Sequence, residues 1–312
     1  MDEDVILLAK DLQAFKWYYV ASCTVIFFDY FLTLSDEVEY AWKGRKGPIF
    51  FLFLLNRYCA MSFCTITLFA YFSPLWTFEL PSFFLGGERG FSSGLIRCNR
   101  FAIVEWLQAL LAAIPAEAVL LIRVYALTGS RKLYILILSL LPLTQCIIVI
   151  YAMAQPGENN ALPLPELSAQ SNGTDLFHVC VLFSNPVMDT LYLTVSILFD
   201  SIVFVITLRA TVQCRKIIPT TLLLQRIQRD GTLYFGIILT GNVVWMIFAL
   251  CGRPGLKLMN AQPSMIFTSV MISRLTLSLR RTSNERYSAW SFKAFELSDT
   301  LADNEPLRAG IS

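Results

Sequence analysis

The sequence predicts an all-α, polytopic membrane protein with seven transmembrane helices, its N-terminus outside and its C-terminus in the cytoplasm. Composition is the first observation behind this prediction. Of 312 residues, 55% are hydrophobic and 15% are charged, whereas soluble domains have about 25% charged residues. The second observation is a series of apolar runs near the ~20 residues that a helix needs to cross ~30 Å of hydrocarbon. The third is an uneven distribution of lysine and arginine between the connecting segments.

Seven apolar runs are candidates for the spans. Helices are expected rather than a barrel, because alternating apolar and polar strands are not seen. The fourth run has no charged residue. The seventh is the weakest, since it is short, rich in serine and threonine and interrupted by Arg274; without it the protein would have six spans. The runs are residues 17–34, 49–73, 101–127, 133–154, 187–208, 231–251 and 263–279.

The orientation follows from the positive charges. With the N-terminus outside, the inner segments hold 16 lysines and arginines and the outer segments hold 7. The connection at 155–186 contains neither residue type. Because positive charges are retained in the cytoplasm, we expect residues 1–16 outside, a helical domain over 17–280 and a cytoplasmic, partly disordered tail over 281–312. The plasma membrane is favoured over internal membranes.

Three cysteines and one asparagine fall on the predicted outer side. Cys98 precedes the third span, and Cys180 lies in the connection between spans four and five. We favour a disulfide between these two residues. Cys251, near the same face, allows two other pairings, and all three could instead be buried thiols. Asn172 begins an Asn-Gly-Thr sequon and is a candidate for glycosylation.

Five ionisable residues interrupt the apolar runs, and they are Asp29, Arg57, Glu117, Asp200 and Arg274. Each would cost about 2.5–3.5 kcal/mol at the centre of a bilayer, so each needs a partner or a polar cavity. At ~1.5 Å of helical rise per residue, all five lie about 9–14 Å from the cytoplasmic face, level with Asn56. We therefore predict an intramembrane ionic layer at this depth.

Asp29 and Arg57 are the pair expected first, because they lie at equal depth on consecutive antiparallel helices. Asp29, Thr33, Asp36 and Tyr40 form one helical stripe that should face the bundle. Three interpretations of the layer stay open. It could fix the helix register, switch between two arrangements, or conduct ions or protons.

The chain lacks the residues of several membrane enzymes. It has one histidine, His178, and no CxxC pair among its eight cysteines, so a metal centre is not expected. The seventh run has no lysine that could form a retinal Schiff base. We expect no catalytic site, no metal and no cofactor. The expected partners are the lipid bilayer, a small apolar ligand and a cytoplasmic signalling protein, but no nucleic acid.

The predicted cytoplasmic connection at residues 209–230 is basic. It could bind a partner or anionic lipid, or it could serve only to retain this segment in the cytoplasm. Its candidate contact residues are Arg215, Lys216, Arg226 and Arg229.

Several motifs resemble those of a large family of fungal, chiefly basidiomycete, membrane proteins. The first runs from Phe28-Asp29-Tyr30 to Ala41-Trp42-Lys43, within residues 17–65. The N-terminal region of that family is known only as a domain of unknown function, so the resemblance implies seven spans and no assigned activity. It extends to about Arg281. The later motifs are Leu54-Leu55-Asn56-Arg57-Tyr58, Arg123-Val124-Tyr125-Ala126-Leu127, Phe199-Asp200-Ser201, the segment from Arg229 to Phe235, and Ser273-Arg274-Leu275.

The layout is also similar to that of G-protein-coupled receptors. The likeness is one of topology, because Ile122 rather than an acid precedes Arg123-Val124-Tyr125 and the seventh run has no NPxxY motif. The leading hypothesis is a receptor-like membrane protein. The alternatives are a transporter or ion-coupled permease that uses the intramembrane acids, and a non-catalytic membrane scaffold.

Overall fold

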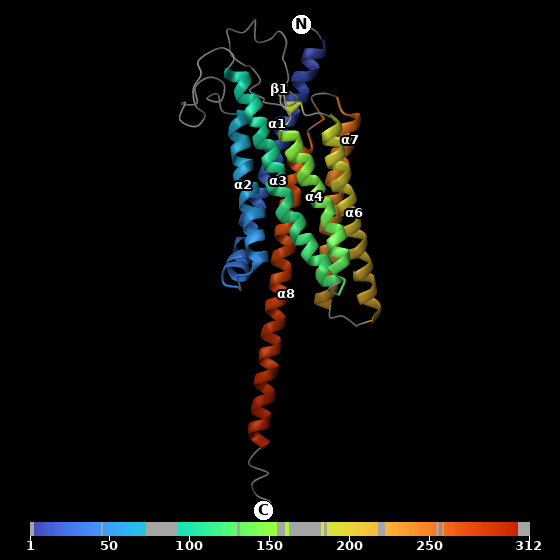
Figure 1. Ribbon diagram of the computed structural model, residues 1–312. Coiled ribbons are helices and arrows are strands. Elements are labelled where there is room, and N and C mark those ends of the chain that lie inside the picture. The colour runs from blue at the N-terminus through green and yellow to red at the C-terminus, as the bar shows by residue number, and fades with distance from the viewer. Residues whose placement is uncertain are drawn as a thin grey trace, which may run out of the picture.

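The computed structural model describes residues 3–44, 46–72, 93–129, 132–154, 160–161, 182–183, 186–217, 222–253, 256–257 and 259–304. The fold is all-α, as predicted, and helices dominate the described residues (Figure 1). One two-stranded antiparallel pair, β1 (Asn160–Ala161) with β2 (Leu182–Phe183), is the exception. The α-helices are α1 (Glu3–Asp36), α2 (Pro48–Phe72), α3 (Ser93–Leu127), α4 (Lys132–Ala154), α6 (Pro186–Ile217), α7 (Leu222–Cys251) and α8 (Ala261–Asn304), and the π-helix η1 (Glu37–Trp42) extends α1.

Six of the described helices are long and apolar enough to cross a membrane. They correspond to the first six predicted runs and indicate a multi-pass membrane protein. α8, which contains the seventh run, is not among the helices that are long and apolar enough to cross a membrane. The six spans are Ala9–Trp42, Pro48–Phe72, Glu105–Leu127, Lys132–Ala154, Val187–Ala210 and Leu233–Cys251.

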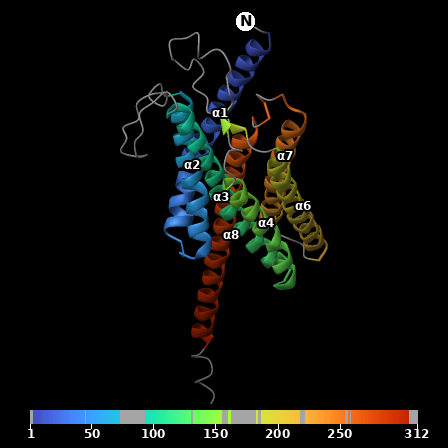
Figure 2. The ribbon, with the colours of Figure 1, turned by 45° about the horizontal axis from the view of Figure 1, so that its top comes forward.

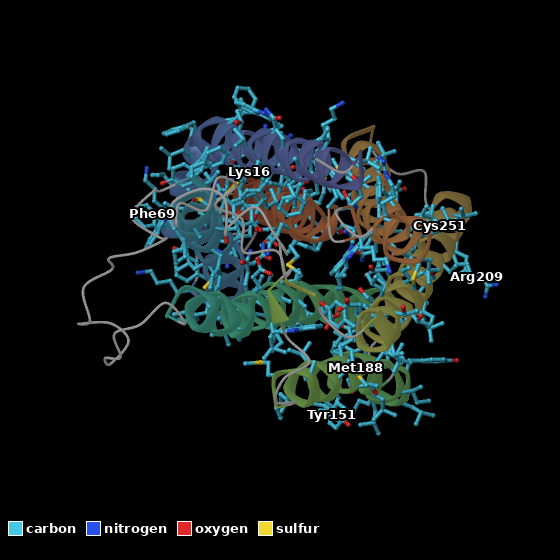
Figure 3. The ribbon with its side chains drawn as sticks, turned by 90° about the horizontal axis from the view of Figure 1, so that it is seen from above. Lys16, Phe69, Tyr151, Met188, Arg209 and Cys251 are labelled. Atoms are coloured by element: carbon cyan, nitrogen blue, oxygen red, sulfur yellow. A yellow bond between two sulfur atoms is a disulfide. The ribbon has the colours of Figure 1, made fainter. Side chains whose placement is uncertain are left out.

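The position of α8 explains its polar composition. α8 packs against α1, α2, α3 and α7, and Figure 3 shows it enclosed by these helices when the bundle is seen from above. No residue from 261 to 278 is exposed. A helix surrounded by protein needs no lipid-facing surface, so serine, threonine and glutamine can replace leucine and isoleucine wherever they find hydrogen-bond partners.

α4 shows the opposite relation between composition and burial. It packs only at one side, against α3 and α6, and most of its large apolar side chains are exposed. An aqueous solvent would not tolerate so extended an apolar face, whereas the hydrocarbon of a bilayer would cover it. The exposed residues are Leu133, Tyr134, Leu136, Ile137, Leu140, Leu143, Ile147, Ile150 and Tyr151.

The helices extend beyond the apolar runs. α1 begins at Glu3 rather than at residue 17, and its early residues Leu12 and Phe15 are buried. α8 continues to Asn304, well past residue 279 and past the other helices at the end opposite the start of α1 (Figure 1). The apolar run marks only the part of a helix that lipid requires. Backbone hydrogen bonds continue through polar residues of good helix propensity.

The basic segment at 209–230 is therefore largely helical, which corrects the prediction of a connecting loop there. Arg215 and Lys216 belong to α6, and Arg226 and Arg229 belong to α7. Their side chains lie outside the described residues. The side chain of Cys98 also lies outside the described residues. Cys180, Asn172 and the end of the predicted tail, residues 305–312, lie outside them entirely.

One disulfide joins α1 to α2 within the described part of the chain. It links Cys23 to Cys64, whose Cα atoms are 6.3 Å apart, and both residues are buried in the core between α1, α2 and α8. Cys251 is a free, exposed thiol. The sequence predicts a disulfide only among the outer cysteines, because Cys23 and Cys64 lie inside two apolar runs.

Candidate functional site

Four charged side chains form an ionic cluster between α1, η1, α2 and α8, namely Asp29, Glu37, Arg57 and Arg274. Arg57 Nε lies 3.0 Å from Glu37 Oε2, and Arg57 Nη1 lies 3.9 Å from Asp29 Oδ2. On its other side Asp29 accepts a hydrogen bond from Arg274 Nε. The cluster thus contains two acids and two bases, and it ties three separate segments of the chain together.

Arg57 is the centre of the cluster, and its guanidinium is fully surrounded. Its Nη2 donates to Thr33 Oγ1 at 2.7 Å and to the carbonyl of Tyr30 at 3.1 Å. Its Cζ lies 5.0 Å from the centre of the Tyr30 ring, a cation–π distance. With its side chain only 4% exposed, Arg57 depends on these partners, because a buried charge without them would be strongly destabilising.

Glu37 is fully buried and was not among the predicted site residues. Its Oε1 accepts hydrogen bonds from Trp42 Nε1 at 3.0 Å and from the Tyr58 hydroxyl at 2.8 Å. The predicted stripe placed Asp36 toward the bundle, but Asp36 is only partly buried. The spacing Asp29, Thr33, Glu37 continues one face in steps of four residues. Glu37 begins the wider π-helical turn η1, a feature often found at functional sites.

Asn56 lies beside the cluster and fastens α2 to α8. Its Nδ2 donates to the carbonyl of Ser269 at 3.0 Å and to Ser273 Oγ at 3.3 Å. Ser269 Oγ returns a hydrogen bond to the carbonyl of Asn56 at 3.0 Å. Asn56 therefore contacts α8 at Ser273, directly before Arg274, and about one turn earlier at Ser269, without taking part in an ion pair.

A second polar region, here called the acidic cavity, lies between α3, α6, α7 and α8. Figure 2 shows α1 and α2 on one side of the bundle, α6 and α7 on the other, and α8 between them. The cavity contains about 510 Å³ of empty space, its open mouth included. Its wall carries both remaining predicted acids, Glu117 from α3 and Asp200 from α6. The other lining residues are Ala109, Ala112, Ala113, Ala116, Leu120, Tyr192, Ser196, Ile238, Asn242, Trp245, Ser264, Met265 and Thr268.

Hydrogen bonds connect one acid of the cavity to α7 and α8. Asn242 Nδ2 donates to Asp200 Oδ2 at 2.6 Å, and Ser264 Oγ donates to Asn242 Oδ1 at 2.8 Å. Gly241 permits the close approach of α7 to α8 at this point, because a Cβ there would lie 3.2 Å from Ser264 Oγ. The small residue thus brings Asn242 within reach of both partners.

Neither acid of the cavity forms an ion pair with any residue that the structure describes. Glu117 is 8% exposed and Asp200 is 9% exposed. The five predicted charges therefore do not form one mutually paired layer. Asp29, Arg57 and Arg274 lie together with Glu37, whereas Glu117 and Asp200 face a cavity. Helix depth indicates the level of a residue but not which side of its helix faces which neighbour.

Fold and site together define a multi-pass α-helical membrane protein with a buried ionic cluster and a separate acidic cavity. Residues 17–72 match a family described as a family of unknown function (DUF6533). The matched segment contains Asp29, Glu37 and Arg57, and the residues of the acidic cavity lie beyond it. Neither the curated proteins nor the solved structures include a match to this chain.

Proposed function

We propose that the protein is a receptor-like membrane protein in which α8 links the acidic cavity to the cytoplasmic side. The N-terminus is outside and the C-terminus inside in this proposal. The connecting segments on the same side of the membrane as the C-terminus hold more lysine and arginine than those on the other side, and this excess supports the orientation. α8 leaves the bundle at the end opposite the start of α1 (Figure 1), as an odd number of crossings requires.

One observation carries the proposal: a single helix takes part in both polar regions. Ser264, Met265 and Thr268 of α8 line the cavity, and Arg274 of α8 binds Asp29. Thr268 and Arg274 are separated by about 9 Å along the helix. A ligand that moves the upper part of α8 therefore moves Arg274 with it.

The ionic cluster has the properties of a switch that can be released. Arg57 and Glu37 are almost fully buried, whereas the side chain of Arg274 is 36% exposed. Arg274 has fewer protein contacts to lose, so it can leave Asp29 at lower cost than Arg57 can. Asp29 keeps Arg57 as a neighbour after such a release. α8 would then shift relative to α1 and α2 while those two helices stay joined.

A distance measurement tests this coupling. Spin-labelled non-canonical residues at Ile49 and Ser283, both exposed, would report the distance between α2 and α8 in nanodiscs. We expect Arg274→Gln to add a second distance population that is absent from the wild type. An unchanged distribution would favour a scaffold. Glu39→Gln, an exposed acid, is the matched control.

A flux measurement separates the receptor from a transporter, which the two unpaired acids of the cavity would also suit. Purified protein in liposomes should move protons, sodium ions and methylammonium no faster than empty liposomes do. Flux above that level, reduced by Glu117→Gln or Asp200→Asn, would replace the receptor proposal with a transporter.

A further inference from the structure

We propose that the acidic cavity binds a small organic ammonium ion whose apolar body carries a hydrogen-bond acceptor. The effect of the ligand on α8 rests on the proposed function, but binding of the ligand can be measured independently. The proposal assigns a ligand class to a site formed by Glu117, Asp200 and Trp245. It differs from the apolar ligand that the sequence suggests, because the cavity wall carries two carboxyl groups.

The two carboxylates supply the preference for a cation. Both are more than nine-tenths buried, and no described lysine or arginine pairs with either. Buried acids without a cationic partner are unfavourable in a membrane, and a bound ammonium group would neutralise the site. Asn242 occupies one oxygen of Asp200, and the other oxygen is not used by that bond.

Trp245 gives an independent indication of a ligand. It lines the cavity and is 7% exposed. Its indole Nε1 is buried and has no hydrogen-bond partner in the described structure. An unpaired buried donor costs about 1–3 kcal/mol, so the site is incomplete without an acceptor. A cation alone cannot supply this acceptor, which is why the ligand also needs an acceptor atom.

The rest of the wall favours an organic ligand over a metal ion. Ala109, Ala112, Ala113 and Ala116 present one small, apolar face of α3 to the cavity. These side chains offer no ligand atoms to a metal, whereas they can pack against hydrocarbon. No group of three or more metal-binding side chains occurs among the described residues.

Three probes of equal length test the proposal on the full chain in nanodiscs. They are 3-methoxypropylamine, which carries a cation and an acceptor, n-pentylamine, which carries the cation alone, and 1-pentanol, which is neutral. We expect calorimetric affinities to fall in that order. Removing a charge-assisted hydrogen bond should weaken binding by about tenfold or more. Equal affinity for the amines and the alcohol would overturn the proposal.

Three variants assign the binding to these side chains. Glu117→Gln and Asp200→Asn keep the size of each side chain, and each should weaken both amines by about tenfold. Trp245→Phe should abolish the preference for the methoxy compound and leave n-pentylamine binding intact. Glu105→Gln, on the same helix but outside the cavity wall, should change neither. Amine binding that survives both acid substitutions would place the ligand elsewhere and refute the assignment.

The results also separate this inference from the proposed function. Amine binding together with amine flux into liposomes would support the ligand class and reject the receptor. Amine binding without flux supports both. If no amine binds, the ligand class is wrong, and the coupling between Ile49 and Ser283 remains a separate test of the receptor.

Discussion

Arg274 donates a hydrogen bond to Asp29 across 245 residues of sequence. This contact joins the seventh described α-helix, α8, to the first, α1, and so connects the two ends of the helical domain. Arg57 approaches the second oxygen of the same carboxylate. Asp29 therefore stands between two arginines of unequal burial, and the consequences of removing each arginine should differ.

Replacing Arg57 with glutamine should cost about 3–5 kcal/mol of stability, because Glu37 would be left buried without a cation. Replacing Arg274 with glutamine should cost less than replacing Arg57, because the Arg274 side chain is 36% exposed and Asp29 keeps Arg57 as a neighbour. Reversible unfolding in mixed micelles would measure both. Equal costs would contradict the central role of Arg57.

Glu37→Gln should destabilise the protein more than Glu39→Gln. Glu37 is fully buried and accepts from Trp42 and Tyr58, whereas Glu39 is exposed. Loss of the charge opposite Arg57 should cost about 3 kcal/mol or more, and Glu39→Gln should lie within about 0.5 kcal/mol of the wild type. Unfolding of the two variants side by side gives the comparison. A neutral Glu37→Gln would show that Arg57 does not need it.

Asn56→Ala should cost about 1–2 kcal/mol, since it removes hydrogen bonds from α2 to both Ser269 and Ser273 of α8. Thr65→Ala is the matched control. Thr65 is exposed on the same helix, and its hydroxyl donates to the Met61 carbonyl within that helix. Loss of the hydroxyl should therefore change stability little. The thermal midpoint in nanodiscs distinguishes the two, and equal midpoints would mean that Asn56 does not fasten the helices.

Two glycines of α7 should respond differently to alanine. Nothing lies within 4 Å of a Cβ at Gly236, so Gly236→Ala should be neutral or stabilise by up to about 1 kcal/mol through helix propensity. A Cβ at Gly241 meets Ser264 Oγ at 3.2 Å, which disturbs the bond from Ser264 to Asn242. We expect Gly241→Ala to be about 1 kcal/mol less stable than Gly236→Ala. The two variants should also differ in amine affinity: Gly241→Ala should weaken amine binding, and Gly236→Ala should leave it unchanged.

The orientation predicts glycosylation at Asn172. Expression in a eukaryotic host should give a glycan that a peptide amidase removes, and Asn172→Gln should abolish the mass difference. The positive-inside distribution is the physical reason. If a sequon introduced after residue 304 is glycosylated and Asn172 is not, the proposed orientation is wrong and the C-terminus lies outside.

Much of the fold could be predicted from sequence, because lipid imposes a simple rule. A segment that crosses a bilayer must be apolar over a fixed length, and α4 follows this rule most closely since it is the least enclosed helix. α8 departs from it because neighbouring helices cover most of its surface between residues 261 and 278. The polar residues of α8 are tolerated because side chains and carbonyls of the surrounding helices form hydrogen bonds with them.

The site was predictable in part. Asp29, Arg57, Glu117, Asp200 and Arg274 stand out because a charge within an apolar run is costly. Glu37 lies where the run has already become polar, and so it carried no comparable indication. Asn242 and Trp245 are unremarkable in sequence. Their importance comes from the hydrogen bond of one to Asp200 and the unpaired indole of the other.

The apolar runs alone indicate that the chain crosses a membrane several times, and they show that five charges interrupt these runs. Both follow from the transfer free energy of side chains, a property of each residue alone. The tertiary structure decided which charges meet. Rotation of each helix about its axis is set by packing against its neighbours, and that rotation brings Arg274 to Asp29 and turns Glu117 and Asp200 toward a shared cavity.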